Sequence, residues 1–325
     1  IYMKKFRFLK KSFALSLAFS FLIILPLFSQ HQDAGTTGFS TLKIYYSARA
    51  NAMGQAMLGR AMNFEGMQFN PATLIKAKNK AVYTTFADHF VGSGGGSINY
   101  MVPKNIYTSY GFYLNYWNSG SIDRTDIGAN GEFIELNDTF GAQDITAGFS
   151  VAKFVSPALD AGGSVKLVLD QIDGKSATAA LIDLGILHHT PNEKIKVGLT
   201  IRNLGFQLSH YTNKDYSEGI PITFGAGIGI DAAKNTLLNI DLNKANGENF
   251  IGKFGIEQSV HPSLVLRAGF KTNGGDYSIG GDLGWSSGIS LGLGWTWKKY
   301  AIDYAIASYG DLGFTNQVSI RYNFD

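Results

Sequence analysis

Histidines are the side chains that would have to carry acid–base or metal chemistry in this chain, because the sequence contains no cysteine. A hydrolase needs a serine, a histidine and an orienting polar group that converge at one place. None of the six histidines lies in such a motif: His31, His89, His188, His189, His210 and His261. His188 and His189 are adjacent, so on a strand they face opposite sides and cannot hold one metal ion together. The sequence therefore predicts neither an enzyme nor a bound metal or cofactor.

Gly94, Gly95 and Gly96 form a glycine run that could suggest a phosphate-binding loop. Such a loop is followed by Lys-Ser or Lys-Thr at the start of a helix, and neither feature is present here. A hairpin, or a strand that lets another backbone approach closely, is the better interpretation. The net charge of +3 is small, which argues against a nucleic-acid partner.

An alternation of apolar with small or polar residues runs through the chain from about residue 143, which is the period of a β-strand. The clearest segment has Ile289, Leu291, Leu293, Trp295 and Trp297 on one face, with Ser, Gly, Thr and Lys on the other. Two further segments near residues 300 and 318 repeat the pattern up to Phe324. We expect these segments to lie side by side in one sheet.

The strands number about 14, near residues 80, 94, 107, 143, 159, 177, 195, 222, 236, 250, 264, 289, 300 and 316. An even number is typical of a transmembrane antiparallel β-barrel of the bacterial outer membrane. A soluble β-sandwich also alternates, but its outer face is rich in Lys and Glu, whereas the polar face here is mainly Gly, Ser, Thr and Asn. The fold class predicted is therefore an all-β barrel with a short N-terminal helical plug, in which charges of both signs on the inner face pair across strands. These are Lys196, Arg202, Asp231, Lys253, Glu257, Arg267, Lys271, Asp303 and Arg321.

The first residues predict export. Lys4, Lys5, Arg7, Lys10 and Lys11 precede an apolar run over residues 12–28, the order of a secretory signal peptide. We therefore expect three segments: a cleaved signal peptide over residues 1–30, a helical plug segment over 31–79, and an outer-membrane barrel over 80–325. Outer-membrane lipid would surround that barrel.

Residues 48–62 favour a helix broken at Gly54 and Gly59, because they are rich in Ala and Met and lack β-branched side chains. Met53, Met57 and Met62 fall close to one face of it. They would pack against the barrel wall or, as the alternative, form a ligand surface. Asn70 and Pro71 then mark a turn.

The plug segment resembles the N-terminal signature of the PorV/PorQ family, through Ala48, Arg49, Ala50, Met53, Gly54 and Ala56 and then Asn70, Pro71 and Ala72. The resemblance continues in Arg202–Gly205, Asp303–Ala305 and Gly310–Gly313, whereas residues 60–69 depart from it. Channels of the FadL type are more distant relatives that share the Asn-Pro-Ala turn. The resemblance implies an accessory barrel of type IX protein secretion that binds the C-terminal domains of secreted cargo, with secretion-system components as further partners. The alternative is a FadL-like channel for hydrophobic small molecules.

Partner binding would be carried by the long irregular stretches, which we place at about 117–142, 204–221 and 272–287, since long loops face outwards in such barrels. Aromatic side chains in or beside them could anchor a protein partner or form a girdle at the membrane rim. The candidates are Trp117, Tyr211, Tyr216, Tyr277 and Trp285.

Overall fold

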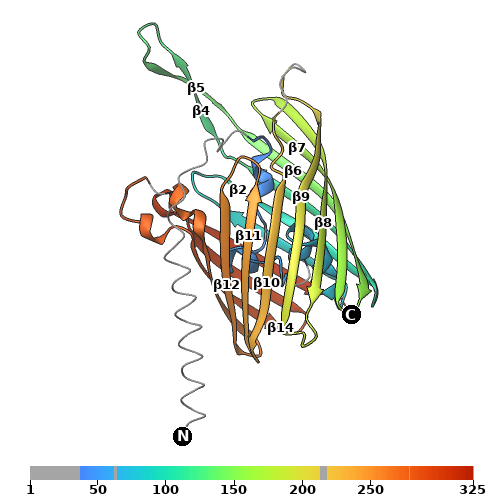
Figure 1. Ribbon diagram of the computed structural model, residues 1–325. Coiled ribbons are helices and arrows are strands. Elements are labelled where there is room, and N and C mark those ends of the chain that lie inside the picture. Colours follow the sequence, from blue (N-terminus) through green and yellow to red (C-terminus); the bar gives the residue numbers. More distant parts are fainter. Residues whose placement is uncertain (1–36, 62–63, 213–217, 278, 325) are drawn as a thin grey trace.

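A computed structural model describes residues 37–61, 64–212, 218–277 and 279–324 of the chain (Figure 1). The expected signal peptide, together with Met62 and Tyr216, lies outside these residues. None of the helices within them is long and apolar enough to cross a membrane. The architecture is therefore set by strands.

Fourteen antiparallel strands close into one barrel, as the alternation predicts. In its first half are β1 (Ala81–Asp88), β2 (Gly94–Asn105), β3 (Thr108–Asn118), β6 (Ala142–Ser156), β7 (Leu159–Ile172), β8 (Lys175–His189) and β9 (Ile195–Ser209). The second half holds β10 (Thr223–Ala233), β11 (Thr236–Ala245), β12 (Phe250–His261), β13 (Leu264–Lys271), β14 (Ile289–Trp297), β15 (Tyr300–Ser308) and β16 (Phe314–Asn323). The seam is formed by β1 and β16, with Thr85 opposite Ser319.

The outer face of the barrel is apolar because every second side chain points outwards. Leu291, Leu293 and Trp295 of β14 are 54%, 44% and 44% exposed, whereas Ser290, just before Leu291, faces the interior and is buried. The rings of Trp295 and Trp297 stack with centroids 6.3 Å apart. This outer surface has the apolar and aromatic character of a membrane-spanning barrel.

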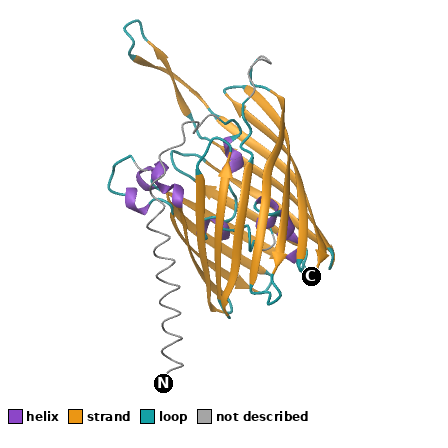
Figure 2. Cartoon of the chain, viewed as in Figure 1, coloured by secondary structure: helices purple, strands orange, loops and turns teal. Residues whose placement is uncertain are grey.

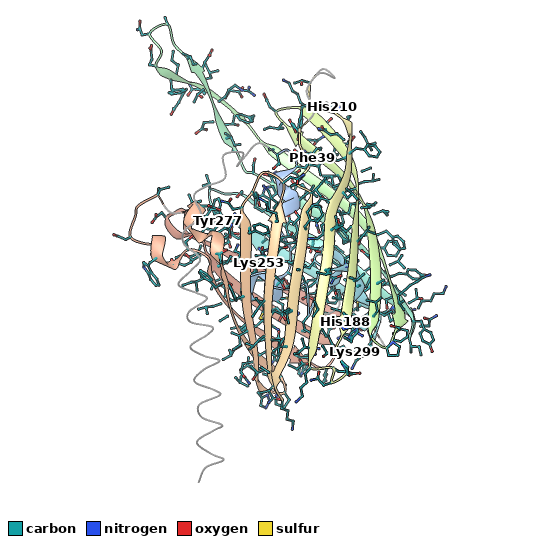
Figure 3. All side chains as sticks on the ribbon, in the orientation of Figure 1. Phe39, His188, His210, Lys253, Tyr277 and Lys299 are labelled. Atoms are coloured by element: carbon teal, nitrogen blue, oxygen red, sulfur yellow. The ribbon has the colours of Figure 1, made fainter. Side chains whose placement is uncertain are left out.

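The two ends of the barrel differ in the length of their connections (Figures 1 and 2). At the short-turn end, where Figure 3 labels His188 and Lys299, most strands are joined by tight turns such as residues 157–158. At the long-loop end, labelled by His210, the connections are mostly longer. One carries a hairpin of β4 (Ile122–Ile127) and β5 (Phe133–Phe140) that projects away from the barrel. The loop expected from residue 204 is shorter than predicted, since β9 continues to Ser209.

The plug segment lies inside the barrel as four short helices: η1 (Ser40–Lys43), α2 (Ala48–Ala52), α3 (Glu65–Gln68) and η2 (Pro71–Lys76). The helix expected over residues 48–62 is wrong beyond Ala52. Gly54 and Gln55 both have φ of 60°, a conformation that ends a right-handed helix. The chain thus turns within the lumen instead of running along it.

Candidate functional site

Two of the three methionines singled out in the plug, Met53 and Met57, are packed, whereas Met62 lies outside the described residues. Met53 and Met57 are fully buried in a cluster with Ala50, Leu58 and Phe69. Met53 lies over β12, where a Cβ on Gly255 would come within 2.5 Å of its carbonyl oxygen. The barrel wall therefore supplies glycine where the plug approaches most closely.

Asn70 and Pro71 fix the turn that was singled out from the sequence. The Asn70 side chain donates from Nδ2 to the carbonyl oxygens of Leu58 (2.9 Å) and of Ile186 in β8 (3.1 Å). Its Oδ1 accepts from the backbone N–H of Ala72, so Asn70 caps η2, with Pro71 as the first residue of that helix. One fully buried amide thus ties the plug to itself and to the wall.

A network of buried ion pairs joins the plug to β12 and continues from there to β13 and β15. Arg49 of α2 donates from Nε to the Glu257 carboxylate (2.8 Å), which also accepts from Arg267 (2.7 Å). Arg267 reaches Asp303 on β15 at 2.6 Å, and Arg49 lies 3.8 Å from Glu65 in α3. The expected cross-strand pairing is confirmed for Glu257, Arg267 and Asp303.

Two further anchors were missed by sequence reasoning. The Asp241 carboxylate of β11 accepts from the backbone N–H groups of Met57 (2.6 Å) and Leu58 (2.8 Å). Asp160 of β7 lies 2.6 Å from His189 Nε2 and 3.0 Å from Lys76 Nζ at the end of the plug. His189 points inwards and His188 outwards, as their adjacency predicted. Nothing local in the sequence distinguishes Asp241 or Asp160 from the other inward-facing polar residues.

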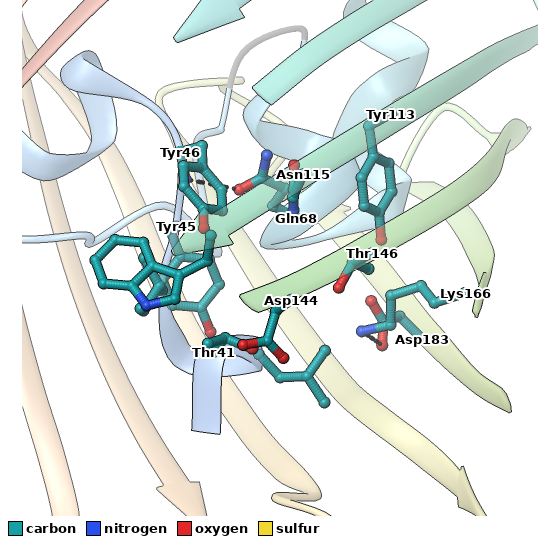
Figure 4. A pocket seen from close by; sticks show the side chains of 13 residues that line it. Thr41, Tyr45, Tyr46, Gln68, Tyr113, Asn115, Asp144, Thr146, Lys166 and Asp183 are labelled. Atoms are coloured by element: carbon teal, nitrogen blue, oxygen red, sulfur yellow. Dashed lines mark hydrogen bonds and ion pairs between the residues drawn. The ribbon is translucent and has the colours of Figure 1, made fainter. Parts of the chain in front are cut away.

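The barrel wall is irregular at β9. Arg202 and Asn203 both face inwards and both oppose Asp183 of β8, because a β-bulge shifts the register there. Asn203 has φ of 60°, and its backbone N–H donates to Asp183 Oδ1 at 2.7 Å. Lys166 of β7 pairs with the same oxygen at 2.8 Å. The bulge is thus held by a buried charge pair on the inner face (Figure 4).

Tyr113 and Lys166 separate two hollows in this part of the wall. On the inner side is a cavity of about 30 Å³, lined also by Tyr46 and Gln68, which is room for about one water molecule. On the outer side is an apolar groove of about 930 Å³ that the same two residues border. The groove is lined by Ile98, Phe112, Leu114, Phe149, Val165 and Phe206. The Tyr113 ring occupies the space beside Gly148, where a Cβ would collide with it.

The aromatic candidates for partner binding are not gathered in one place. Trp117 lies one residue before the end of β3 and is buried against Tyr46 and Ala87. Tyr211 packs partly buried on the cluster around Phe39, and Tyr277 contacts Tyr309 edge-on at 4.8 Å between ring centroids. Trp285 is 78% exposed in a long loop. Of the four described candidates, Trp285 presents the most surface to a partner, and this role stays a prediction.

Two ionisable groups at the long-loop end have shifted pKa values. Hydrogen bonds from the backbone N–H groups of Ile279, Gly281 and Leu283 lower the pKa of Asp311. Burial and the neighbouring Lys271 lower the pKa of His89 to about 4. Asp311 therefore stabilises the loop between β13 and β14 as an anion, whereas His89 is neutral at this end of the barrel.

Solved structures share this barrel at low sequence identity. The toluene transporter TodX of Pseudomonas putida is 12% identical, with a TM-score of 0.63, over 86% of this chain and 98% of that one. The monoaromatic hydrocarbon channel CymD is 12% identical, with a TM-score of 0.61, over 86% and 97% of the two chains. A FadL homologue from Pseudomonas aeruginosa is 10% identical, with a TM-score of 0.56, over 87% and 99%.

At these identities the likeness establishes the fold alone, a closed 14-stranded antiparallel β-barrel with the architecture of these solved structures. No protein-family model and no curated sequence matches the chain.

Proposed function

We propose that this protein is a non-catalytic channel for hydrophobic small molecules in a bacterial outer membrane, with its long loops outwards. The observation that carries the proposal is the partition at the β9 bulge. Tyr113 and Lys166 stand between the lumen and an apolar groove on the outer face. The fold shared with a toluene transporter and a monoaromatic hydrocarbon channel supports the same conclusion.

The contacts that hold the plug favour a lateral path for the solute, through the barrel wall. Charge pairs and hydrogen bonds to β8, β11, β12 and β16 close the lumen along its axis, so an apolar solute entering from the long-loop end meets packed side chains. A solute that crosses the wall near Tyr113 would instead reach the apolar groove and then lipid, without passing through bulk water. Transfer of apolar surface into lipid is favourable, so no energy source is needed.

Uptake of labelled toluene by intact Gram-negative cells that lack other hydrocarbon channels tests this function. We expect faster uptake with the protein than without it, and faster still with Tyr113→Ala, which removes the ring beside Gly148. Tyr107→Ala is the matched control, because Tyr107 is 55% exposed in a turn away from the partition. Uptake equal to that of empty cells, at confirmed surface expression, would overturn the proposal.

The second candidate is an accessory of type IX secretion, implied by the resemblance to the PorV/PorQ family. The projecting β4–β5 hairpin favours it, because Ile127 and Phe133 are 70% and 81% exposed and the two strands pair only with each other. Such edges suit the addition of a strand from a partner. Capture of a type IX C-terminal domain by the intact barrel, lost when residues 122–140 are replaced by a short turn, would support this candidate. No capture by either form would remove it.

A further inference from the structure

A second cavity, of about 190 Å³, lies at the long-loop end of the lumen. The plug supplies Tyr45 and Gln55 to it, the wall supplies Arg202, Lys253 and Lys271, and Tyr277 and Tyr309 contribute from the loops. Figure 3 shows Lys253 within the barrel, below Tyr277 at the long-loop end. We call this the basic cavity, and its location differs from that of the partition at Tyr113.

Positive charge in the basic cavity is not balanced by its lining. Arg202, Lys253 and Lys271 are only 3%, 6% and 7% exposed. Among the described residues none of these three has a carboxylate within ion-pair distance, in contrast to Arg49 and Arg267. The expected cross-strand pairing is therefore wrong for these three cations. Asp241 lies opposite Lys253 in the strand register, but its carboxylate accepts from the plug backbone instead.

The other two charged residues of the lining do not offset the excess of basic side chains. Lys43 and Glu248 pair with each other at 2.7 Å, with 31% and 26% of their side chains exposed. Four basic side chains and one carboxyl group thus line the cavity. Burying an unpaired charge is costly, and such a charge is normally matched by a partner.

Two residues that line the cavity also carry buried donors without acceptors. The Nε of Arg202 and the Nδ2 of Asn243 are buried without a partner in the described structure. The two side chains also bond to each other, since Arg202 Nη2 donates to Asn243 Oδ1 at 2.8 Å. Both orphan groups are donors, so the missing partner is an acceptor.

Aromatic rings give the cavity a second chemical character. The Tyr45 ring has Arg202 5.3 Å and Lys253 5.4 Å from its centroid, and it stacks on Phe69 at 4.4 Å. Lys271 lies 4.8 Å from the centroid of Tyr309. The cations are thus held at ring faces, and rings border the space between them.

We infer that the basic cavity binds a compact aromatic carboxylate of about the size of benzoate. A carboxylate would accept from Arg202, Asn243 and Lys253, as charge-assisted hydrogen bonds require. A cavity of about 150 Å³ is known to hold a benzene molecule, so this one admits a ring with a carboxyl group. This site goes beyond the proposed channel, since it lies apart from the partition at Tyr113. Binding of the carboxylate can be measured without transport.

Equilibrium dialysis of the whole barrel in non-ionic detergent against labelled benzoate tests the site. We expect saturable binding at one site per chain, and binding of the uncharged isostere benzamide at least tenfold weaker. Lys253→Met and Lys271→Met should each weaken benzoate binding about tenfold or more. Lys234→Met, in an exposed turn at the other end of the barrel, is the matched control and should leave it unchanged.

Three results would overturn the inference: equal binding of benzamide, equal binding of acetate, or undiminished benzoate binding by Lys253→Met and Lys271→Met together. The folded state of each variant is checked by its heat-modifiable migration in gels. If Lys253→Met does not fold, Lys253→Gln takes its place. Toluene uptake separates the two proposals. Benzoate binding without toluene uptake would remove the channel alone, and uptake without benzoate binding would remove this site alone.

Discussion

The backbone N–H of Met57 donates to Asp241 Oδ2 at 2.6 Å, across a sequence separation of 184 residues. The neighbouring N–H of Leu58 donates to the same oxygen at 2.8 Å. One carboxylate on β11 therefore fixes the point at which the plug turns.

Asp241→Ala should release this turn. Leaving a buried donor unsatisfied costs about 1–3 kcal/mol, and two N–H groups lose their acceptor here, so we expect a loss of about 3 kcal/mol of local stability. Hydrogen exchange at Met57 and Leu58 should accelerate, while exchange in the strands changes little. Asp126→Ala on the projecting hairpin is the control. Unchanged protection of Met57 in Asp241→Ala would contradict the assignment.

Arg49→Met should destabilise the whole barrel, because it leaves Glu65 buried without a cation. Breaking a buried ion pair costs about 3–5 kcal/mol. Glu257 keeps Arg267, so the loss falls mainly on Glu65. Adding Glu65→Gln to Arg49→Met should therefore restore part of the thermal midpoint, and a double variant less stable than Arg49→Met would argue against this.

Gly198→Ala should displace the plug from β9, because the new Cβ would collide with the Leu58 carbonyl oxygen. Such overpacking costs about 1–3 kcal/mol. Gly163→Ala on β7 is a matched control, since the nearest atom to its Cβ would be 3.5 Å away, an ordinary contact. Equal thermal midpoints for the two variants would contradict the close approach.

His89 should make stability depend on acidity. In the folded protein the pKa of His89 is about 4, below its ordinary value of about 6.5. Between these two pH values the unfolded chain therefore binds a proton at His89 that the folded chain does not bind. Stability should be fully present above about pH 6.5 and fall as the pH drops towards 4. His89→Phe should flatten this part of the stability profile, and His261→Phe, at the exposed end of β12, is the control.

Asp311 should keep the loop after β13 ordered except in acid. Its lowered pKa means that the three backbone hydrogen bonds are present above the ordinary carboxyl pKa of about 3.9 and are lost as the pH falls through the folded value. Asp311→Ala should accelerate exchange at Ile279, Gly281 and Leu283 at neutral pH. The thermal midpoint of the barrel should not move, and a large drop would show that the loop supports the strands.

Much of the barrel could be predicted from the sequence because alternation is local. Each strand carries its own period, so the segments near residues 289, 300 and 316 were recognisable without knowledge of their neighbours. The projecting hairpin was not, since β4 and β5 are polar or exposed on both faces. The bulge at Arg202 and Asn203 was also missed, because one extra residue shifts the period without an unusual composition.

The site was less accessible to sequence reasoning because its contacts are distant along the chain. Asp241 and Lys253 lie opposite each other on neighbouring strands. Asp241 nevertheless bonds to the plug, whereas Lys253 lines the basic cavity. Which charge is paired depends on the path of the plug backbone. The resemblance around Asn70 and Pro71 located the plug, but not the strands that it would touch.

Ser319 has a consequence for the order of assembly. Its hydroxyl accepts from the backbone N–H of Ala48 in the plug (2.9 Å) and shares a hydrogen bond with Thr85 across the seam (2.8 Å). The plug leads into β1, and β16 is the last strand of the described barrel, so closing the seam joins the first and last of these strands around the plug. Ser319 therefore couples closure of the seam to the position of the plug, because one hydroxyl bonds to both. Contacts of such long sequence separation form slowly during folding.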